Sequence, residues 1–540
     1  MINFLATNGV SNLSLDIVFT VLMVFFIIAV VVVAVWLYTK YIKKPRYKET
    51  FEEKVKAYDS LPEEKKGERP VPLSFLGICF AVMGVGLIIR LLFMFLVRGY
   101  RSEFYSITNG IILNSSPSSL YTSHAIAHYP VITYIYSFFG LFARAFNLDA
   151  SSEAMNVFVK LPLILADMGL IFVGYKIAKK YVNEYVAVIT AGFIAVFPPF
   201  IIVSSVWGSV FAITVLLLVL SFYFLANRNL LGLFISYTLA LLTSRAALYL
   251  FPIIATVVIY QFARSFLFVR RNTIEGGIKG IFKNPESRNV FLIPIYIVGF
   301  WIASWLITLP LIHNHSFNPF VFTFMIYLYP LSQFSYFGYN ALNIFNLFVG
   351  ISGNGAPWTA SAGISILFSV IFGVIITGLV ALVYLSRKNR ALVVFLAGYV
   401  YFTLSIFFIG FGATNLIIVI ALFLLAFLLI RDKRILQLVA VLGIIFTLNI
   451  SFIFISAGYL NNIGQDVFNS GIYTGETLLG GSTDAMGWLV ANLILSIFAM
   501  FTFIYATIII LDIAMSSRRK LLADLDRPNA LTAFAKFIRE

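Results

Sequence analysis

The sequence predicts an all-α membrane protein with many transmembrane helices. Of its 540 residues, 61% are hydrophobic and only 11% are charged, and the mean hydropathy is +0.96. A soluble protein carries about 25% charged residues, so this composition excludes a water-soluble globule. It also excludes intrinsic disorder, which requires low hydrophobicity and high charge. Apolar runs of about 20 residues, the length that crosses a bilayer as a helix, recur along the chain.

The first apolar run, residues 15–38, predicts a permanent membrane helix rather than a cleavable signal. Residues 1–14 contain no Lys or Arg, so the basic region that begins a signal peptide is missing. We assign residues 1–39 to this helix and residues 40–72 to a charged cytoplasmic segment. For the charged segment, a short helix lying on the membrane and a solvated loop are both open.

The remaining apolar runs extend the prediction to thirteen transmembrane helices in a bundle. Residues 73–350 form the core, residues 351–514 form the C-terminal helices, and residues 515–540 form a basic cytoplasmic tail. The predicted helices lie near residues 15–38, 74–97, 156–178, 184–205, 209–226, 229–247, 248–267, 291–312, 361–385, 390–410, 413–431, 434–457 and 488–514.

Clusters of basic residues predict the orientation of this bundle. Loops 313–360 and 458–487 contain no Lys or Arg, whereas the alternate loops carry most of the excess that gives the net charge of +15. Because basic loops stay in the cytoplasm, we predict an integral plasma-membrane protein, of bacterial origin, with its N-terminus outside and its C-terminus in the cytoplasm. The clustered residues are Lys176, Lys179, Lys180, Arg228, Arg264, Arg270, Arg271, Lys279, Lys283, Arg387, Lys388, Arg390, Arg431, Lys433, Arg434, Arg518, Arg519 and Lys520.

This orientation requires that the apolar stretch 129–146 does not cross the membrane. If it crossed, the cluster at Lys176 to Lys180 would lie outside. We therefore predict that residues 98–155 form a long external loop with helices in the membrane interface. Because structureless loops of this length are uncommon, the loop is a candidate functional element.

Charged residues inside predicted spans are costly and face a cavity or a partner. Arg90, Lys160, Asp167 and Arg245 are of this kind. One interpretation is a polar cavity that binds an anionic headgroup, and the other is structural pairing between helices. Lys160 and Asp167, seven residues apart, share one helix face. Arg245 lies near a helix end, where its side chain could instead extend to the interface.

The sequence favours neither a metal nor a cofactor. All four histidines lie in predicted external segments, but no carboxylate accompanies them at ligand spacing. The single cysteine, Cys79, allows no intramolecular disulfide or cysteine-based metal site. No phosphate-binding glycine loop is visible, and we predict no nucleic-acid partner. The expected partners are a membrane lipid or a polyprenyl-linked saccharide, with a partner membrane protein also open.

Five short motifs in order resemble membrane glycosyltransferases of the GT-C class, in particular mannosyltransferases related to the enzyme that adds the second mannose of GPI anchors, and their bacterial relatives. The resemblance covers residues 100–350 and implies a GT-C-like bundle whose external first loop carries the site. The motifs are Leu120-Tyr121 through His128-Tyr129-Pro130, Lys160-Leu161-Pro162 to Asp167, Phe197-Pro198-Pro199 with Val206-Trp207-Gly208, Leu241 to Pro252, and Asn340-Ala341-Leu342-Asn343. From these motifs together with the polar groups near the external face, we predict as substrate-binding residues Arg98, Arg101, His128, Tyr129, Lys160, Asp167, Trp207, Arg245, Asn340 and Asn343.

The chain departs from the family where the family has its working polar residues. Arg101 stands where the family has an aspartate, and an arginine stays protonated and cannot act as a base. Glu103, two residues away, is the possible replacement base. The other departures are Ser209 and Phe211 for a Gln and an Asp, Ser244 and Ala246 for a Lys and a Gln, and a neutral stretch near Phe411 to Asn415 for an external His-Glu-Arg-Tyr.

These departures leave three functional hypotheses. The first is a GT-C-fold protein that has lost transferase activity and serves envelope glycan assembly as an accessory that binds a lipid-linked saccharide or a partner. The second is an active glycosyltransferase that uses a polyprenyl-phosphate sugar and a rearranged site with Glu103. The third is a lipid or polysaccharide transporter, although we find no internal repeat of the kind that transporters show.

Overall fold

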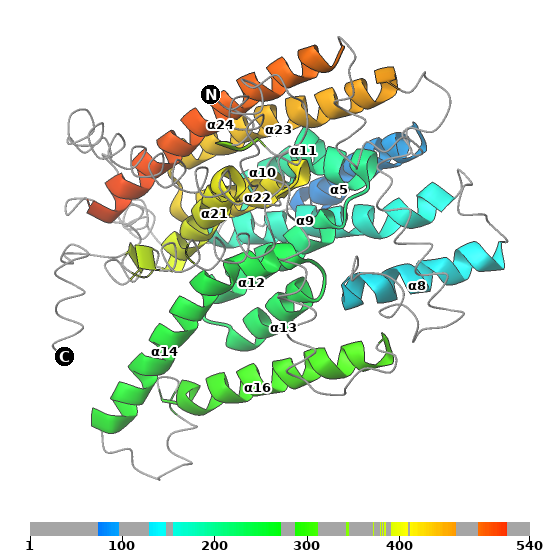
Figure 1. Cartoon of the computed structure of the whole chain (residues 1–540). Coiled ribbons are helices and arrows are strands. Elements are labelled where there is room, and N and C mark those ends of the chain that lie inside the picture. The colour runs from blue at the N-terminus through cyan, green and yellow to red at the C-terminus, as the bar shows by residue number, and fades with distance from the viewer. Residues whose placement is uncertain are drawn as a thin grey trace, which may run out of the picture.

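The computed structural model describes residues 74–96, 129–146, 155–271, 284, 287–311, 342–344, 371, 378–379, 381, 383–384, 390–408, 411–460 and 484–515. These residues form a bundle of α-helices (Figure 1). The helices are α5 (Ser74–Leu96), α8 (Pro130–Ala145), α9 (Met155–Tyr181), α10 (Glu184–Val196), α11 (Pro198–Ile201), α12 (Phe211–Ala226), α13 (Leu230–Leu241), α14 (Phe251–Arg271), α16 (Asn289–Thr308), α21 (Arg390–Phe407), α22 (Leu416–Ile430), α23 (Lys433–Leu460) and α24 (Asp484–Met515). Short helices of other types are η3 (Ile202–Trp207, a π-helix) and the 3₁₀-helices η4 (Arg245–Leu250), η5 (Leu309–Leu311) and η7 (Ala413–Asn415).

The length and composition of these helices confirm the prediction of an all-helical membrane protein. Within the described residues, seven helices are long and apolar enough to cross a membrane. An eighth candidate is α10 together with α11 and η3, which is bent by 50° at a short break. The count of thirteen, the external loop and the orientation stay predictions, and the first predicted helix and the basic tail lie outside the described residues.

Two predicted spans differ from the helices that the structure describes. The predicted span 184–205 is interrupted, because Pro198 and Pro199 end α10 and redirect the chain. The predicted boundary at residues 247–248 lies instead at residues 242–244, where Ser244 caps the following 3₁₀-helix with its side chain. Helix α13 has only 12 residues, about 18 Å at 1.5 Å per residue, so it is too short to cross alone.

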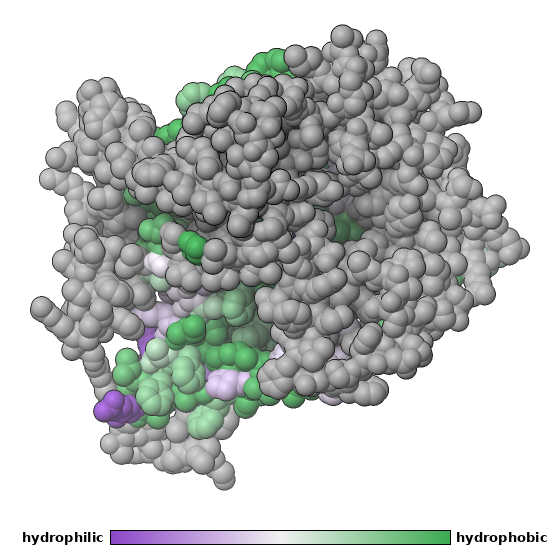
Figure 2. Space-filling model, in the orientation of Figure 1, coloured by the Kyte–Doolittle hydropathy of each residue, from purple (hydrophilic) through white to green (hydrophobic). Residues whose placement is uncertain are grey.

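Helix α22 is the centre of the bundle. Of residues 413–430, which include this helix, 94% are buried. Helices α9, α12, α21 and α23 pack around it. A helix that is hydrophobic on every side belongs in the interior of a bundle. By contrast, in the apolar stretches of 18 residues within α5 and α16, only 22% and 11% of the residues are buried. The described residues that reach the surface in Figure 2 are mostly hydrophobic, as expected of helices that face lipid.

Polar contacts join helix ends that the charge pattern predicts to lie on the cytoplasmic side. Lys180, at the end of α9, donates a hydrogen bond to Asn227 at the end of α12, with 2.6 Å between Nζ and Oδ1. Arg434, at the start of α23, forms two ion pairs. Its Nη1 lies 2.9 Å from Oδ2 of Asp512 at the end of α24, and its Nη2 lies 2.6 Å from Oδ2 of Asp432. Helices α9 and α12 therefore end side by side, and α23 begins where α24 ends, while the predicted topology stays a prediction. We call this end of the bundle the basic end.

Helix α8 is the described part of the predicted external loop. It has 16 residues, about 24 Å, which is shorter than the hydrocarbon core of about 30 Å. It packs against α9, and the hydroxyl of Tyr134 donates to the carbonyl of Ile307 in α16 at 2.7 Å. Its depth in the membrane stays a prediction.

Candidate functional site

Four interruptions of helices lie at the end of the bundle opposite the basic end. They are residues 129–130 before α8, residues 202–210 around η3, residues 242–250 around η4, and residues 408 and 411–415 between α21 and α22. We call them together the interrupted rim. Interrupted helices expose backbone groups that a continuous helix would hide, so such places are where membrane proteins build binding sites.

Direct contacts join three of these four interruptions, and helix packing relates the fourth to them. The amide of Val131 donates to the carbonyl of Leu242 at 2.9 Å, which links the start of α8 to the end of α13. The ring centres of Tyr249, in η4, and Phe411 lie 4.8 Å apart. Helices α12 and α13 pack side by side and are joined by a short turn, so the start of α12 and the end of α13 lie at the same end. Three of the motif segments named from the sequence therefore lie at this rim.

Arg90 stabilises the break between α10 and α11. Pro198 and Pro199 have no amide hydrogen, so they cannot bond to the carbonyls four residues earlier, which belong to Ile194 and Ala195. The guanidinium of Arg90, on α5, supplies the missing donors: Nη1 lies 2.8 Å from the Ala195 oxygen and Nη2 lies 3.3 Å from the Ile194 oxygen. An arginine on one helix thus caps the broken end of another.

Asp167 balances the charge of Arg90 inside the bundle. Its Oδ2 lies 2.9 Å from Nε of Arg90 and accepts a hydrogen bond from the hydroxyl of Ser204 at 2.6 Å. Arg90 and Asp167 are 0% and 1% exposed, and a buried charge requires a partner and hydrogen bonds. Of the two interpretations of these charges, the contacts of Asp167 favour structural pairing between helices.

Lys160, on the same helix as Asp167, contacts the residue that follows Ser204. Its ammonium donates to the carbonyl of Ser205 at 2.7 Å and is buried. Ser205 lies in the π-helix η3, which ends at Trp207 and is followed by Gly208 in the left-handed conformation, with φ of 77°. Glycine is favoured there because it has no Cβ. Lys160 therefore holds the segment that carries Trp207 and Gly208.

The serines at two family positions act as helix caps. The hydroxyl of Ser209 accepts from the amide of Phe211 at 3.3 Å, and that of Ser244 accepts from the amide of Ala246 at 3.2 Å. Both serines are buried. They satisfy backbone amides at the starts of α12 and η4, which is a local structural task.

Arg245 and a group of aromatic rings form the rest of the described rim. Arg245 is half-buried at the start of η4. Tyr401 donates to the side-chain oxygen of Asn415 at 2.9 Å, and its ring lies 5.5 Å from that of Phe411. The sequence did not single out Tyr401, and it named Asn415 only as the end of a neutral stretch, because neither their spacing nor their charge indicates that they meet.

The other predicted site residues divide into two groups. Tyr129 and Asn343 are buried, and both interact with other residues of the protein. The remaining five, which include the possible base, lie outside the described residues. They are Arg98, Arg101, Glu103, His128 and Asn340. The same holds for all four histidines, and no three metal-binding side chains gather within the part of the chain that the structure describes.

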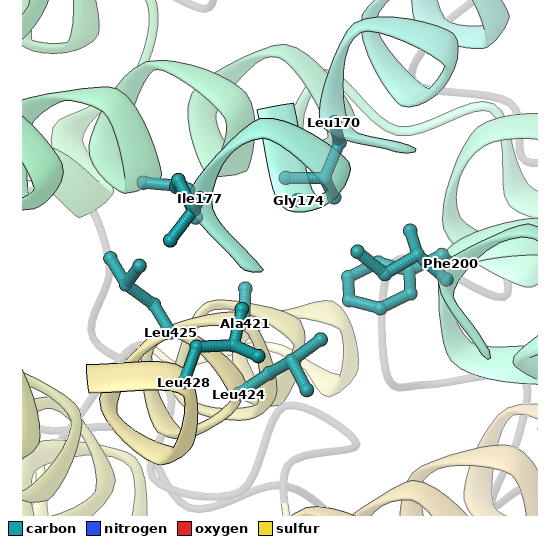
Figure 3. Close-up of a pocket in the computed structure, with 10 residues that line it drawn as sticks. Leu170, Gly174, Ile177, Phe200, Ala421, Leu424, Leu425 and Leu428 are labelled. Atoms are coloured by element: carbon teal, nitrogen blue, oxygen red, sulfur yellow. The ribbon is translucent and has the colours of Figure 1, made fainter. Parts of the chain in front are cut away.

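A small cavity lies away from the rim, between α9, α10, α11, α12 and α22. It has a volume of about 20 Å³ and is lined by apolar side chains, among them Leu170, Phe200 and Leu425 (Figure 3). A cavity needs about 10–15 Å³ to hold one water, and a water needs polar partners. This space is therefore an apolar packing defect rather than a ligand site, and it contains neither Lys160 nor Arg245.

Comparison with known proteins leaves the resemblance as an expectation. No known protein family model and no curated protein match the chain.

Proposed function

We propose that this chain is a GT-C-type membrane protein that binds a polyprenyl-linked saccharide at the interrupted rim and serves envelope glycan assembly without efficient transferase activity. The single observation that carries the proposal is the position of three motif segments at one end of the bundle, where Tyr129-Pro130 and Ser244-Arg245 are joined through Val131 and Leu242 and where Val206-Trp207-Gly208 precedes α12. Segments so far apart in sequence gather in this way when they build one site.

The contacts of the polar residues support the part of the proposal that concerns binding. Arg245 is a half-buried cation near Tyr249, and the ring centre of Tyr249 lies 4.8 Å from that of Phe411. A guanidinium suits a lipid phosphate, because it offers several donors in one plane. Aromatic rings near the membrane surface suit the sugar or the first isoprene units of the same molecule.

The same contacts support a lack of efficient transfer. Transfer to an acceptor hydroxyl needs a base within about 3 Å of the proton, and losing that base costs about 10²–10⁴-fold in rate. Asp167 is the one carboxylate of the predicted site within the described residues, and it is already engaged by Arg90 and Ser204. Ser209 and Ser244 are engaged as caps. Of the predicted site residues, Glu103 is the carboxylate that is left to act as a base.

Lipid retention tests the binding. The purified full-length protein is mixed with a polyprenyl phosphate, and the retained lipid is measured by native mass spectrometry. We expect wild type to retain the lipid and Arg245→Gln to retain several-fold less. Arg288→Gln removes an equal charge from an exposed arginine just before α16 and serves as the matched control. Equal retention by Arg245→Gln and wild type would contradict a phosphate site at the rim.

A transfer assay separates the accessory protein from the active enzyme. Polyprenyl-phosphate hexoses are offered with membrane acceptors to wild type and to Glu103→Gln. We expect no measurable turnover in either, with function in cells retained by the variant. Robust turnover that Glu103→Gln abolishes would establish the active enzyme instead. Movement of the labelled lipid across a vesicle membrane, without transfer, would establish the transporter.

A further inference from the structure

Two helices of the bundle end in an arginine where a glycine is favoured. Arg228, after α12, has φ of 63°, and Arg431, after α22, has φ of 62°. Within the described residues these are the two non-glycine positions with positive φ. The left-handed conformation is disfavoured for a side chain because Cβ approaches the following carbonyl oxygen.

The backbone around Arg228 has the hydrogen bonds of a glycine-type helix end. The amide of Arg228 donates to the carbonyl of Leu225 at 3.3 Å, and that of Asn229 donates to Phe224 at 3.0 Å. These two bonds define the Schellman motif, which usually has glycine at the position of Arg228. A glycine would complete this turn with less strain.

The side chain of Arg228 contributes no contact that would offset this strain. It is exposed, and among the described residues no group forms an ion pair or a hydrogen bond with it. Arg431 differs, since it is partly buried and interacts within the protein. Strained residues that persist without a local structural reason point to a function.

One lysine of α9 lies beside Arg228 at the basic end, and a second lies one turn back along the helix. Lys180 donates to the side-chain oxygen of Asn227, the neighbour of Arg228, at 2.6 Å. Lys176 lies one turn back on the same face of α9, with its ammonium 5.2 Å from the centre of the Phe172 ring. For none of the three cations do the described residues supply a carboxylate partner. The nearby Glu184 pairs with Lys179 instead, at 2.5 Å.

The surroundings of these cations match the level of lipid headgroups. The ammonium of Lys180 lies 5.5 Å and 5.6 Å from the ring centres of Tyr181 and Tyr223, and tyrosine is enriched at membrane interfaces. Next along α13, Leu231 and Ile235 are 48% and 43% exposed and lie one turn apart on one face. The basic side chains of Lys180 and Arg228 thus lie next to the exposed apolar side chains at the start of α13.

We propose that Lys180 and Arg228, with the charge of Lys176 one turn back on α9, bind the phosphodiester headgroup of an anionic phospholipid, whose acyl chain lies along Leu231 and Ile235. The guanidinium can hold two phosphate oxygens at once, and the ammoniums supply further charge. The proposal is independent of the sugar-lipid site at the rim, which lies at the other end of the bundle.

The test exploits opposite effects of one substitution. Arg228→Gly relieves the strained backbone but removes the cation. Binding of 1-palmitoyl-2-oleoyl phosphatidylglycerol to the purified full chain is measured by native mass spectrometry, with phosphatidylcholine for comparison and with free glycerol phosphate as competitor. We expect phosphatidylglycerol to bind about fivefold more weakly to the variant, from about 1 kcal/mol per basic residue near the surface. In phosphatidylcholine nanodiscs, the variant should melt at the wild-type temperature or above.

Two further variants complete the test. Arg228→Lys retains the charge and should retain most of the phosphatidylglycerol affinity. Arg270→Gln removes an exposed arginine at the end of α14 and should leave the affinity as in wild type. Unchanged binding by Arg228→Gly, or an equal loss in Arg270→Gln, would overturn the proposal. So would a lower melting temperature of Arg228→Gly in phosphatidylcholine, or full displacement of the lipid by free glycerol phosphate.

Discussion

Replacing Arg90 by methionine should be among the most damaging single substitutions in the described part of the bundle. Methionine keeps the length and packing of the stem but removes every donor. Asp167 would then be a buried carboxylate without its counter-ion, and the carbonyls of Ile194 and Ala195 would lose their donors. Lipid offers no water to replace them.

The magnitude follows mainly from the charge. Removing one partner of a buried ion pair costs about 3–5 kcal/mol. Hydrogen bonds between membrane helices are worth on average about 0.6 kcal/mol each, so the two carbonyls add only about 1 kcal/mol. We therefore expect Arg90→Met to lower the free energy of unfolding by about 4–6 kcal/mol.

A double-mutant cycle separates the two effects. Asp167→Leu removes the carboxylate, and Ser204 can still donate to the carbonyl of Phe200, which lies 3.1 Å away. The double variant Arg90→Met with Asp167→Leu should therefore lose less stability than the two single variants together. Unfolding by titration with sodium dodecyl sulfate in mixed micelles, followed by circular dichroism, measures each free energy.

The proline residues provide a second test of the same reasoning. In the Arg90→Met background, Pro198→Ala with Pro199→Ala returns two amide donors to the carbonyls of Ile194 and Ala195. We expect a recovery of about 1 kcal/mol. A cost of Arg90→Met below about 1 kcal/mol, the range of exposed pairs, would refute the reasoning. So would simple additivity in the cycle.

Three further predictions concern packing, the basic end and topology. Gly174→Ala should cost about 1–3 kcal/mol, measured by the same titration, because its Cβ would lie 2.5 Å from Cδ1 of Ile194. Asp512→Asn should cost about 1.5–3 kcal/mol, also by titration, because it weakens the 2.9 Å contact with Arg434, a charge-assisted hydrogen bond of a buried carboxylate. A single cysteine at Ser118, in a Cys79→Ala background, should react with a membrane-impermeant reagent in intact cells.

Each of these has a matched control. Gly192→Ala adds the same Cβ where nothing lies within 4 Å, so it should be neutral or slightly stabilising, and a cost equal to that of Gly174→Ala would count against the packing argument. Glu184→Gln removes a pair whose lysine is 44% exposed, and it should cost less than Asp512→Asn. Labelling at Ser60 combined with protection at Ser118 would reverse the predicted topology.

The helices were predictable because an apolar run of about 20 residues has few alternatives in a membrane. Helices α9, α23 and α24 begin and end within four residues of the predicted spans. The break after Val196 was missed, although Pro198-Pro199 stands in the sequence, because hydropathy continues unchanged across it. Hydropathy measures composition, whereas a break depends on backbone donors.

The site was predictable only in part, because pairing depends on distant residues. Arg90 and Asp167 could both be recognised as costly charges, but they are 77 residues apart. The same limit applies to Lys160, whose acceptor is the backbone carbonyl of Ser205. Every residue has a backbone carbonyl, so neither residue type nor spacing indicates which one accepts the hydrogen bond.

The polar residues around the break between α10 and α11 depend on one another. The two prolines free the carbonyls of Ile194 and Ala195, and in lipid these need donors. Arg90 supplies the donors but brings a charge, which in turn requires Asp167. Asp167, which composition alone makes a candidate ligand group, is therefore explained by the helix break itself. Lys160, whose ammonium donates to the carbonyl of Ser205, and Arg245 both stand outside this set of dependencies. Lys160 is buried whereas Arg245 is half-buried, and for that reason the test of ligand binding is placed at Arg245.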